Sequence, residues 1–121
     1  MTTLTIEVRR ADPQDAGAIA AVHRAAWIAC YAGMIPHKPL VQMIERRRED
    51  WWRRAAVGPS TLLVLEAAGK IAGYATVGQN RVRALKQDGE IYELYLLPEY
   101  QGIGLGSYLF RECRGVLRAL R

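Results

Sequence analysis

The first residues of the chain alternate between apolar and polar side chains. Leu4, Ile6 and Val8 are separated by polar residues, and this period of two is typical of a β-strand that buries one face. We therefore expect the chain to begin with a strand.

Two helices are predicted to follow. Asp12 can cap the first one, Pro13 suits its first turn, and apolar residues then repeat three and four positions apart as far as Cys30. The second is predicted over residues 39–55, where apolar positions recur among charged ones.

Two tryptophans lie side by side in this second helical segment. By the same spacing, Trp51 continues the apolar face of the helix and Trp52 falls outside it. We expect Trp51 in the core and Trp52 on the surface.

Three strands and a last helix complete the pattern. Residues 61–67 and 70–77 are rich in branched and aromatic side chains and are separated only by Ala68-Gly69, which predicts an antiparallel hairpin. A polar loop with Asn80 and Asp88 leads to a strand over residues 90–97, and a helix runs from Leu105 almost to Arg121. The predicted order is β-α-α-β-β-β-α.

The length of 121 residues suits a single domain over residues 1–121. Half of the residues are hydrophobic and 24% are charged, which is typical of a soluble globular protein. No apolar run approaches the length of a signal peptide or a membrane span, so we expect a cytoplasmic protein without a membrane partner.

The net charge of +5 favours phosphate-bearing partners. Acidic residues interrupt the richest arginine cluster, however, so a solvated helix face explains it as well as a nucleic-acid surface does, and we expect no nucleic-acid partner. Cys30 and Cys113 have no Cys or His at metal-ligand spacing, so no metal site is predicted.

Three alternating glycines, Gly102, Gly104 and Gly106, come between the last strand and the last helix. Small residues at a helix start leave main-chain N–H groups open to an anion, which predicts a phosphate site. A glycine turn that only lets strand and helix pack is the structural alternative. Gly106 is followed directly by Ser107 without a lysine, which excludes a P-loop, and the glycine spacing does not fit a dinucleotide fingerprint.

The turn resembles the signature of a known family. Residues 101–106, Gln-Gly-Ile-Gly-Leu-Gly, match the Gln/Arg-x-x-Gly-x-Gly/Ala motif of the GNAT superfamily of N-acetyltransferases, at the place where that family carries it. Asp12-Pro13, residues 31–36, 72–75 and 91–100 are similar to its bacterial branch. The resemblance covers essentially the whole chain and implies an α/β (α+β) GNAT fold, a mostly antiparallel sheet flanked by helices.

The resemblance also implies a coenzyme site. The main chain of Leu96 and Leu97 would pair with the pantetheine arm of acetyl-CoA like an added strand, and an N–H of that strand would stabilise the thioester oxygen. The main-chain amides expected to bind the pyrophosphate belong to Gln101, Gly102, Ile103, Gly104, Leu105, Gly106 and Ser107.

Catalytic and acceptor residues are implied less directly. A base must remove a proton from the acceptor amine, and Glu90 matches a position where some family members carry a catalytic glutamate. Glu93 is the competing candidate, and strict alternation places the two on opposite faces unless a bulge intervenes. Trp27 and Tyr31 are candidates for the wall of the acceptor pocket, with core packing as the alternative.

The family pattern continues beyond this sequence with a fifth strand, a helix and two more strands. The GNAT fold is therefore expected to be truncated before the fifth strand, which leaves the fourth with an open edge. We expect a homodimer or strand-swapped oligomer to cover it, unless the sequence is part of a longer chain. The predicted function is acetyl-CoA-dependent acetyl transfer to a primary amine, with an inactive remnant that binds CoA or acts as an interaction module as the alternative.

Overall fold

The computed structural model describes residues 5–79 and 89–119. Leu4, Asn80, Asp88 and Arg121, on which some predictions rest, lie outside these ranges. The strands are β1 (Ile6–Arg10), β2 (Thr61–Ala67), β3 (Lys70–Gln79) and β4 (Gly89–Leu96); the helices are α1 (Ala16–Tyr31), α2 (His37–Glu45), α3 (Glu49–Ala55) and α4 (Leu105–Ala119), with short 3-10 helices η1 (Pro13–Asp15) and η2 (Pro98–Tyr100).

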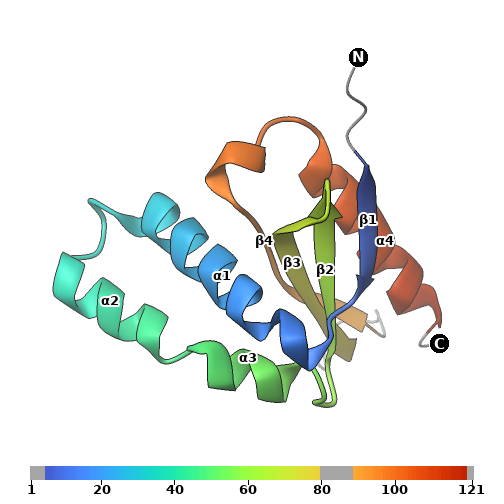
Figure 1. The fold of residues 1–121 in the computed structure, drawn as a ribbon, viewed down its shortest axis with the longest axis horizontal. Coiled ribbons are helices and arrows are strands. Elements are labelled where there is room, and N and C mark those ends of the chain that lie inside the picture. The colour runs from blue at the N-terminus through green and yellow to red at the C-terminus, as the bar shows by residue number, and fades with distance from the viewer. Residues whose placement is uncertain (1–4, 80–88, 120–121) are drawn as a thin grey trace.

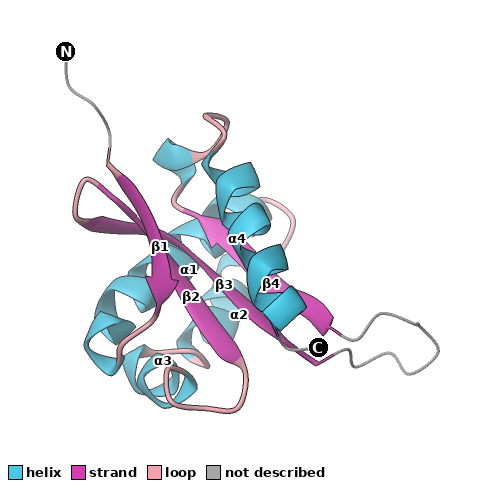
Figure 2. Cartoon of the chain, turned by 90° about the vertical axis from the view of Figure 1, so that its right-hand side faces the viewer, coloured by secondary structure: helices cyan, strands magenta, loops and turns pink. Residues whose placement is uncertain are grey.

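The strands form an antiparallel sheet in the order β1-β2-β3-β4. Helices α1, α2 and α3 lie on one face of the sheet and α4 lies on the other, as Figure 1 and the side view in Figure 2 show. In the described part of the chain, β3 is the only sheet neighbour of β4. The predicted mostly antiparallel sheet flanked by helices is confirmed.

Strand β2 is buried on both faces because helices cover the sheet from both sides. Leu62 and Val64 pack toward α1 and α3, while Leu63 and Leu65 pack toward α4, and none of the four is more than 5% exposed. A continuous apolar run is typical of a strand covered in this way.

The predicted helix start at Asp12 is confirmed. Its carboxylate accepts the N–H of Gln14 at 2.8 Å, and Asp15 accepts the N–H of Asp12 at 2.7 Å. Arg9 donates to both Asp15 and Glu66. The hydrogen bond from Arg9, with that from the Asp12 main chain, holds the pKa of Asp15 below its usual range. The network ties the start of the helical layer to β1 and β2.

The single helix predicted over residues 39–55 is wrong, because two helices, α2 and α3, take its place. Arg48 has an extended main chain, with φ −76° and ψ 179°, and Glu49 and Asp50 form an acidic first turn of α3. Acidic residues favour the start of a new helix through its dipole. The order of elements becomes β-α-α-α-β-β-β-α.

The break between α2 and α3 reverses the predicted burial of the tryptophans. A continuous helix would place Trp51 about two turns after Ile44 on the same face. The extended residue shifts this phase, so Trp52 is fully buried and lies 4.7 Å from the Tyr74 ring, centroid to centroid. Trp51 is only partly buried.

A bulge interrupts the pairing of β3 with β4. Thr76 pairs with Glu93, whereas the next residue, Val77, pairs with Ile91, so Tyr92 is the extra residue of β4. Bulges of this kind redirect side chains. Here both Tyr92 and Glu93 reach the face of the sheet covered by α3.

Candidate active site

Glu93 is the carboxylate at which the helical layer meets β4. Its Oε1 accepts a hydrogen bond from Arg47 Nη1, and its Oε2 accepts one from the Tyr74 hydroxyl at 3.2 Å. Burial and the nearby negative charge of Glu93 raise the pKa of Tyr74 far above its ordinary value, so this hydroxyl stays protonated and donates. The Glu93 side chain keeps 18% of its surface exposed and that of Arg47 keeps 31%, so both can still be approached.

Arg47 reaches Glu93 from the turn between α2 and α3. Its Cζ lies 4.5 Å from the ring centroid of Trp51 and 5.9 Å from that of Trp52. Cation–π contacts of this kind are worth about 0.5–1 kcal/mol at exposed sites and more when water is excluded. The guanidinium is therefore held in place from two sides, by an aromatic face and by a carboxylate.

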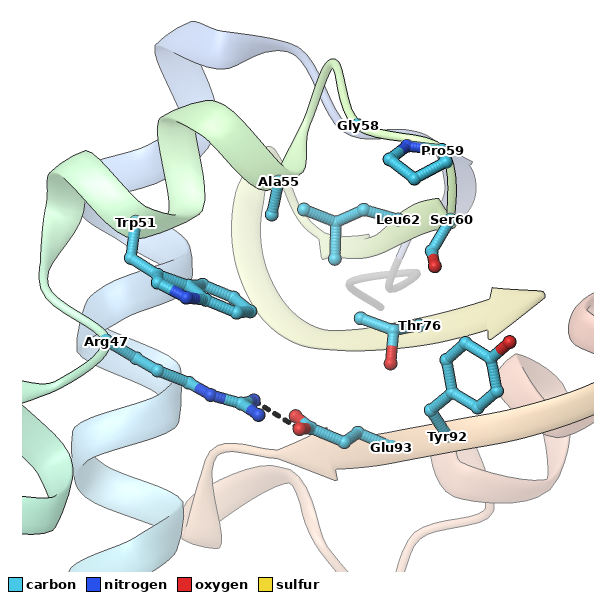
Figure 3. Close-up of a pocket in the computed structure, with 10 residues that line it drawn as sticks. All are labelled: Arg47, Trp51, Ala55, Gly58, Pro59, Ser60, Leu62, Thr76, Tyr92 and Glu93. Atoms are coloured by element: carbon cyan, nitrogen blue, oxygen red, sulfur yellow. Dashed lines mark hydrogen bonds and ion pairs between the residues drawn. The ribbon is translucent and has the colours of Figure 1, made fainter. Parts of the chain in front are cut away.

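A cavity of about 240 Å³ opens beside this ion pair (Figure 3). Arg47 and Glu93 form its charged end, and Trp51 and Leu62 supply apolar walls. Tyr92 closes the side formed by β4, and the loop before β2 closes another. This cavity, called the Glu93 cavity below, thus combines one cation, one anion and a mostly apolar lining.

Glu90, the favoured base of the sequence analysis, lies further along the same strand. The bulge places it opposite Gly78, two residues from the partner of Glu93, so both carboxylates belong to the same face of the sheet. Tyr92 lies across Gly78, where an added Cβ would come within 2.6 Å of its hydroxyl. Glu93 lines the cavity and Glu90 does not.

Trp27 and Tyr31, the residues predicted to form the wall of the acceptor pocket, both lie on α1. Their ring centroids are 5.1 Å apart. A hydrogen bond joins Tyr31 to Tyr95 on β4, and burial, with the neighbouring Tyr31, raises the pKa of Tyr95 to about 12. Neither Trp27 nor Tyr31 lines the Glu93 cavity. Tyr31 therefore links α1 to β4, whereas the Trp27 ring lies next to the rings of His23 and Tyr31 on α1.

The glycine turn has the conformation expected of an anion site. Gly102 and Gly104 have φ of +80° and +88°, which residues with a Cβ rarely adopt. The N–H of Gln101 donates to Pro98 O at 3.2 Å, so this amide is used within the chain. In the described part of the chain, no main-chain oxygen accepts the N–H groups of residues 102–107.

Gly106 differs from the other two glycines because it lies inside α4. A Cβ at this position would be 3.6 Å from Leu96 Cδ1, an ordinary contact. Leu105 is buried in the core, whereas Ile103 and Ser107 are exposed. The turn therefore presents amides and small side chains to solvent at the start of α4.

The outer edge of β4 runs toward this turn. Leu97 donates its N–H to Ala72 O at 2.8 Å and accepts the N–H of Tyr100 at 2.9 Å, so both of its main-chain groups are used within the chain. Main-chain groups alternate along a strand, so the N–H and C=O of Leu96 point away from β3. Gln101 Nε2 donates to Leu96 O at 3.2 Å. Leu96, and not Leu97, has the orientation that an added strand requires.

A groove of about 550 Å³ connects the β4 edge with the first turns of α4. It is lined by Leu94 from the strand and by Gly106, Ser107, Phe110, Arg111 and Arg114 from the helix. Helices α4 and α3 lie on opposite faces of the sheet (Figure 2). The groove is lined from α4 and the Glu93 cavity from α3, so the two approach β4 from opposite sides.

His23 is a buried neighbour of the ion pair. Its ring lies 5.1 Å from Trp27 and 5.5 Å from Trp52, centroid to centroid, and neither ring nitrogen has a hydrogen-bond partner in the described ranges. Burial, assisted by the positive charge of Arg47, lowers the pKa of His23 to about 4. The imidazole is therefore neutral at physiological pH.

Neither a metal-binding cluster nor a membrane-spanning helix occurs among the described residues. No three of their His, Cys, Asp and Glu side chains are grouped so that they could hold a metal ion. None of the helices over residues 5–79 and 89–119 is both long and apolar enough to cross a bilayer.

The sequence profile of the acetyltransferase (GNAT) family matches residues 20–121. The chain belongs to this family. It is 32% identical over 104 residues to the uncharacterized N-acetyltransferase YuaI of Bacillus subtilis, a match that covers 86% of this chain and 60% of that protein. The chain thus spans less than two thirds of the length of this curated relative.

Solved GNAT-family structures have the same fold. The PaiA N-acetyltransferase of Thermoplasma acidophilum, crystallised with coenzyme A, superposes with a TM-score of 0.82 at 21% identity, covering 95% of this chain and 73% of that one. A GNAT acetyltransferase of Brucella melitensis in complex with acetyl-CoA gives 0.66 at 26% identity, covering 96% and 70%. The predicted GNAT fold is confirmed.

Sequence reasoning missed Arg47, Trp51 and Tyr92 as residues of the site. The arginines at 46–48 were interpreted only as a charged surface. The acidic pair Glu49-Asp50, which suits the first turn of a new helix, is the signal that could have indicated a break after Arg48. No sequence signal located the bulge at Tyr92.

Proposed function

We propose that this chain is an acetyl-CoA-dependent N-acetyltransferase that transfers the acetyl group directly to a primary amine. The observation that carries the proposal is one groove lined by Leu94 of β4 and by Gly106 and Ser107 of the turn with open amides. The Glu93 cavity lies on the opposite side of the same strand. The GNAT neighbours crystallised with coenzyme A or acetyl-CoA support it.

The groove beside α4 is the proposed coenzyme site. The amides of residues 102–107 would bind the diphosphate, because charge-assisted hydrogen bonds contribute about 1.5–3 kcal/mol each. Leu94 and Leu96 would pair with the amide groups of the pantetheine arm, since both direct their main-chain groups to the open edge. Arg111 and Arg114 add positive charge to the same groove.

The Glu93 cavity is the proposed acceptor site. Glu93 would accept the proton that the acceptor ammonium must lose before attack, directly or through a water molecule. The neutral amine then forms a bond to the thioester carbonyl carbon, while an N–H of β4 stabilises the charge on the carbonyl oxygen. The carbon–sulfur bond breaks, and the proton that the nitrogen loses as it becomes an amide passes to the departing thiolate, which gives the coenzyme thiol. Glu93 takes the role first assigned to Glu90 because it lines the cavity.

The first half of β4 also has an outer edge, and in the described ranges only β3 pairs with this strand. We propose that a second copy of the chain covers it, through paired edges or exchanged elements. Light scattering at high concentration tests this: a dimer is expected, and a monodisperse monomer would contradict it.

Thiol release from acetyl-CoA in the presence of primary amines tests the proposed reaction. We expect release that depends on the amine and yields an equal amount of N-acetyl product. Calorimetric binding of acetyl-CoA without turnover over a broad amine panel would favour the inactive remnant. The absence of both acetyl-CoA binding and turnover would contradict the enzyme and the inactive remnant alike.

A further inference from the structure

The charged end of the Glu93 cavity offers two opposite charges side by side. Arg47 uses Nη1 for Glu93 Oε1, and its remaining N–H groups have no partner in the described part of the chain. Each carboxylate oxygen of Glu93 can accept more than the one hydrogen bond that it makes. A ligand with one anionic and one cationic group can therefore bind here without breaking the ion pair.

The position of Arg47 favours a planar anion. Its Cζ lies over the Trp51 ring, which restricts the position of the guanidinium, and a guanidinium with free donors suits a carboxylate. A guanidinium that only stabilised Glu93 would not need to line the cavity, but Arg47 does line it. The arrangement thus provides a carboxylate site next to a site for an ammonium group.

The rest of the cavity selects what joins those two groups. Trp51, Ala55, Pro59 and Leu62 give it a mainly apolar lining. Its volume of about 240 Å³ is below the range of roughly 300–1,000 Å³ typical of sites for drug-sized ligands. Small molecules with one apolar side chain fit this description better than long polyamines, whose second ammonium group would be repelled by Arg47.

We propose that the acceptor is a free α-amino acid with a medium-sized apolar or aromatic side chain. Its carboxylate binds Arg47, its ammonium group lies at Glu93, and its side chain enters the cavity beside Trp51 and Leu62. This inference rests on the proposed function and names the substrate class of that same site. Arg47 is then a specificity-determining residue.

Matched acceptors with and without the carboxylate provide the test. Leucine and phenylalanine are compared with isoamylamine and phenethylamine, and putrescine represents the dications. We expect kcat/KM for each amino acid to exceed that of its matched amine by at least tenfold. Equal or higher kcat/KM for the amines or for putrescine would overturn the inference.

The variant Arg47→Gln separates carboxylate binding from support of Glu93. Loss of that support affects both acceptors alike, so the informative quantity is the ratio of kcat/KM between amino acid and amine. We expect this ratio to fall to about one, mainly through a higher KM for the amino acid, and to recover in part in Arg47→Lys. Arg46→Gln, in the same turn but outside the cavity, is the matched control and should leave the ratio unchanged.

An equal loss for both acceptors in Arg47→Gln would assign Arg47 a purely structural role and overturn the inference. Calorimetric titration with acetyl-CoA on the same preparations keeps the two proposals apart. Coenzyme binding without acetylation of any amino acid would overturn the substrate class alone. Absence of coenzyme binding would overturn the proposed function, and the inference with it.

Discussion

Arg47 donates a hydrogen bond to Glu93 across 46 positions of sequence and joins the helical layer to the edge strand of the sheet. Each partner lies at an irregularity of its element: Arg47 at the break between α2 and α3, Glu93 next to the bulge of β4. The charged end of the cavity exists only because both irregularities occur. We regard this pair as the centre of the acceptor site.

Replacing the proposed base should slow the chemical step. Glu93→Gln keeps the size of the side chain but removes its basicity, and general-base catalysis typically contributes about 10²–10⁴-fold. We expect kcat, measured by thiol release, to fall by about a hundredfold or more. The affinity for acetyl-CoA, measured by calorimetry, should stay within about twofold of wild type.

Glu90→Gln is the matched control for that experiment. It removes a carboxylate from the same strand and the same face of the sheet, outside the cavity. We expect its kcat to stay within about threefold of wild type, far from the contribution of a general base. A larger loss in Glu90→Gln than in Glu93→Gln would restore Glu90 as the base.

The stability of the fold should depend on pH through His23. The pKa of His23 is lowered from 6.5 to about 4, so the unfolded chain binds a proton between these pH values that the folded chain does not bind. The free energy of unfolding should therefore fall by about 3 kcal/mol as the pH drops from 6.5 to 4. Well above pH 6.5 the imidazole is neutral in both states and has no such effect.

His23→Leu tests this dependence, with His37→Gln as the control at an exposed histidine. Because neither ring nitrogen of His23 has a partner among the described residues, the leucine variant should be at least as stable at pH 7. Urea denaturation over the pH range should show a smaller decline for His23→Leu only. The same decline in both variants would assign it to other groups.

The two tryptophans should differ in what they support. Trp52 is fully buried, so Trp52→Ala should lower the free energy of unfolding by about 3–5 kcal/mol. Trp51 is only partly buried, so Trp51→Ala loses its contacts with Arg47 and the Trp52 ring. It should cost less, about 1–2 kcal/mol, while raising the KM of the acceptor. Denaturation curves and acceptor kinetics measure the two effects, and similar losses of stability would contradict the distinction.

The features that were predictable from the sequence are local ones. The cap at Asp12, the turn at Ala68-Gly69 and the glycine turn at 102–106 are each specified by neighbouring residues. The turn at Ala68 and Gly69 has φ of 52° and 79°, as a two-residue hairpin requires. Short-range chemistry of this kind can be read directly from a sequence.

The proposed acceptor site could not be predicted in the same way. The helix break at Arg48 and the bulge at Tyr92 each shift the phase of a repeating pattern by a small amount. The helix break buries Trp52 in place of Trp51, and the bulge brings Glu93 to the cavity. A periodic interpretation assumes constant phase, so it placed Glu90 and Glu93 on opposite faces and overlooked Arg47. Glu90 was favoured over Glu93 by the family resemblance alone.

The claim that the amides at the start of α4 hold the coenzyme is tested most directly by calorimetric titration with acetyl-CoA of the wild type, Gly106→Glu and Gly115→Glu. Both variants place a carboxylate on α4 at a glycine without positive φ, and Gly115 is the matched control away from the turn. An acidic residue in the first turn favours the helix, so Gly106→Glu should stay folded while it repels the diphosphate. We predict at least tenfold weaker binding for Gly106→Glu, with Gly115→Glu within about twofold of wild type, tenfold being about 1.4 kcal/mol. Equal affinity in all three proteins would contradict the coenzyme site.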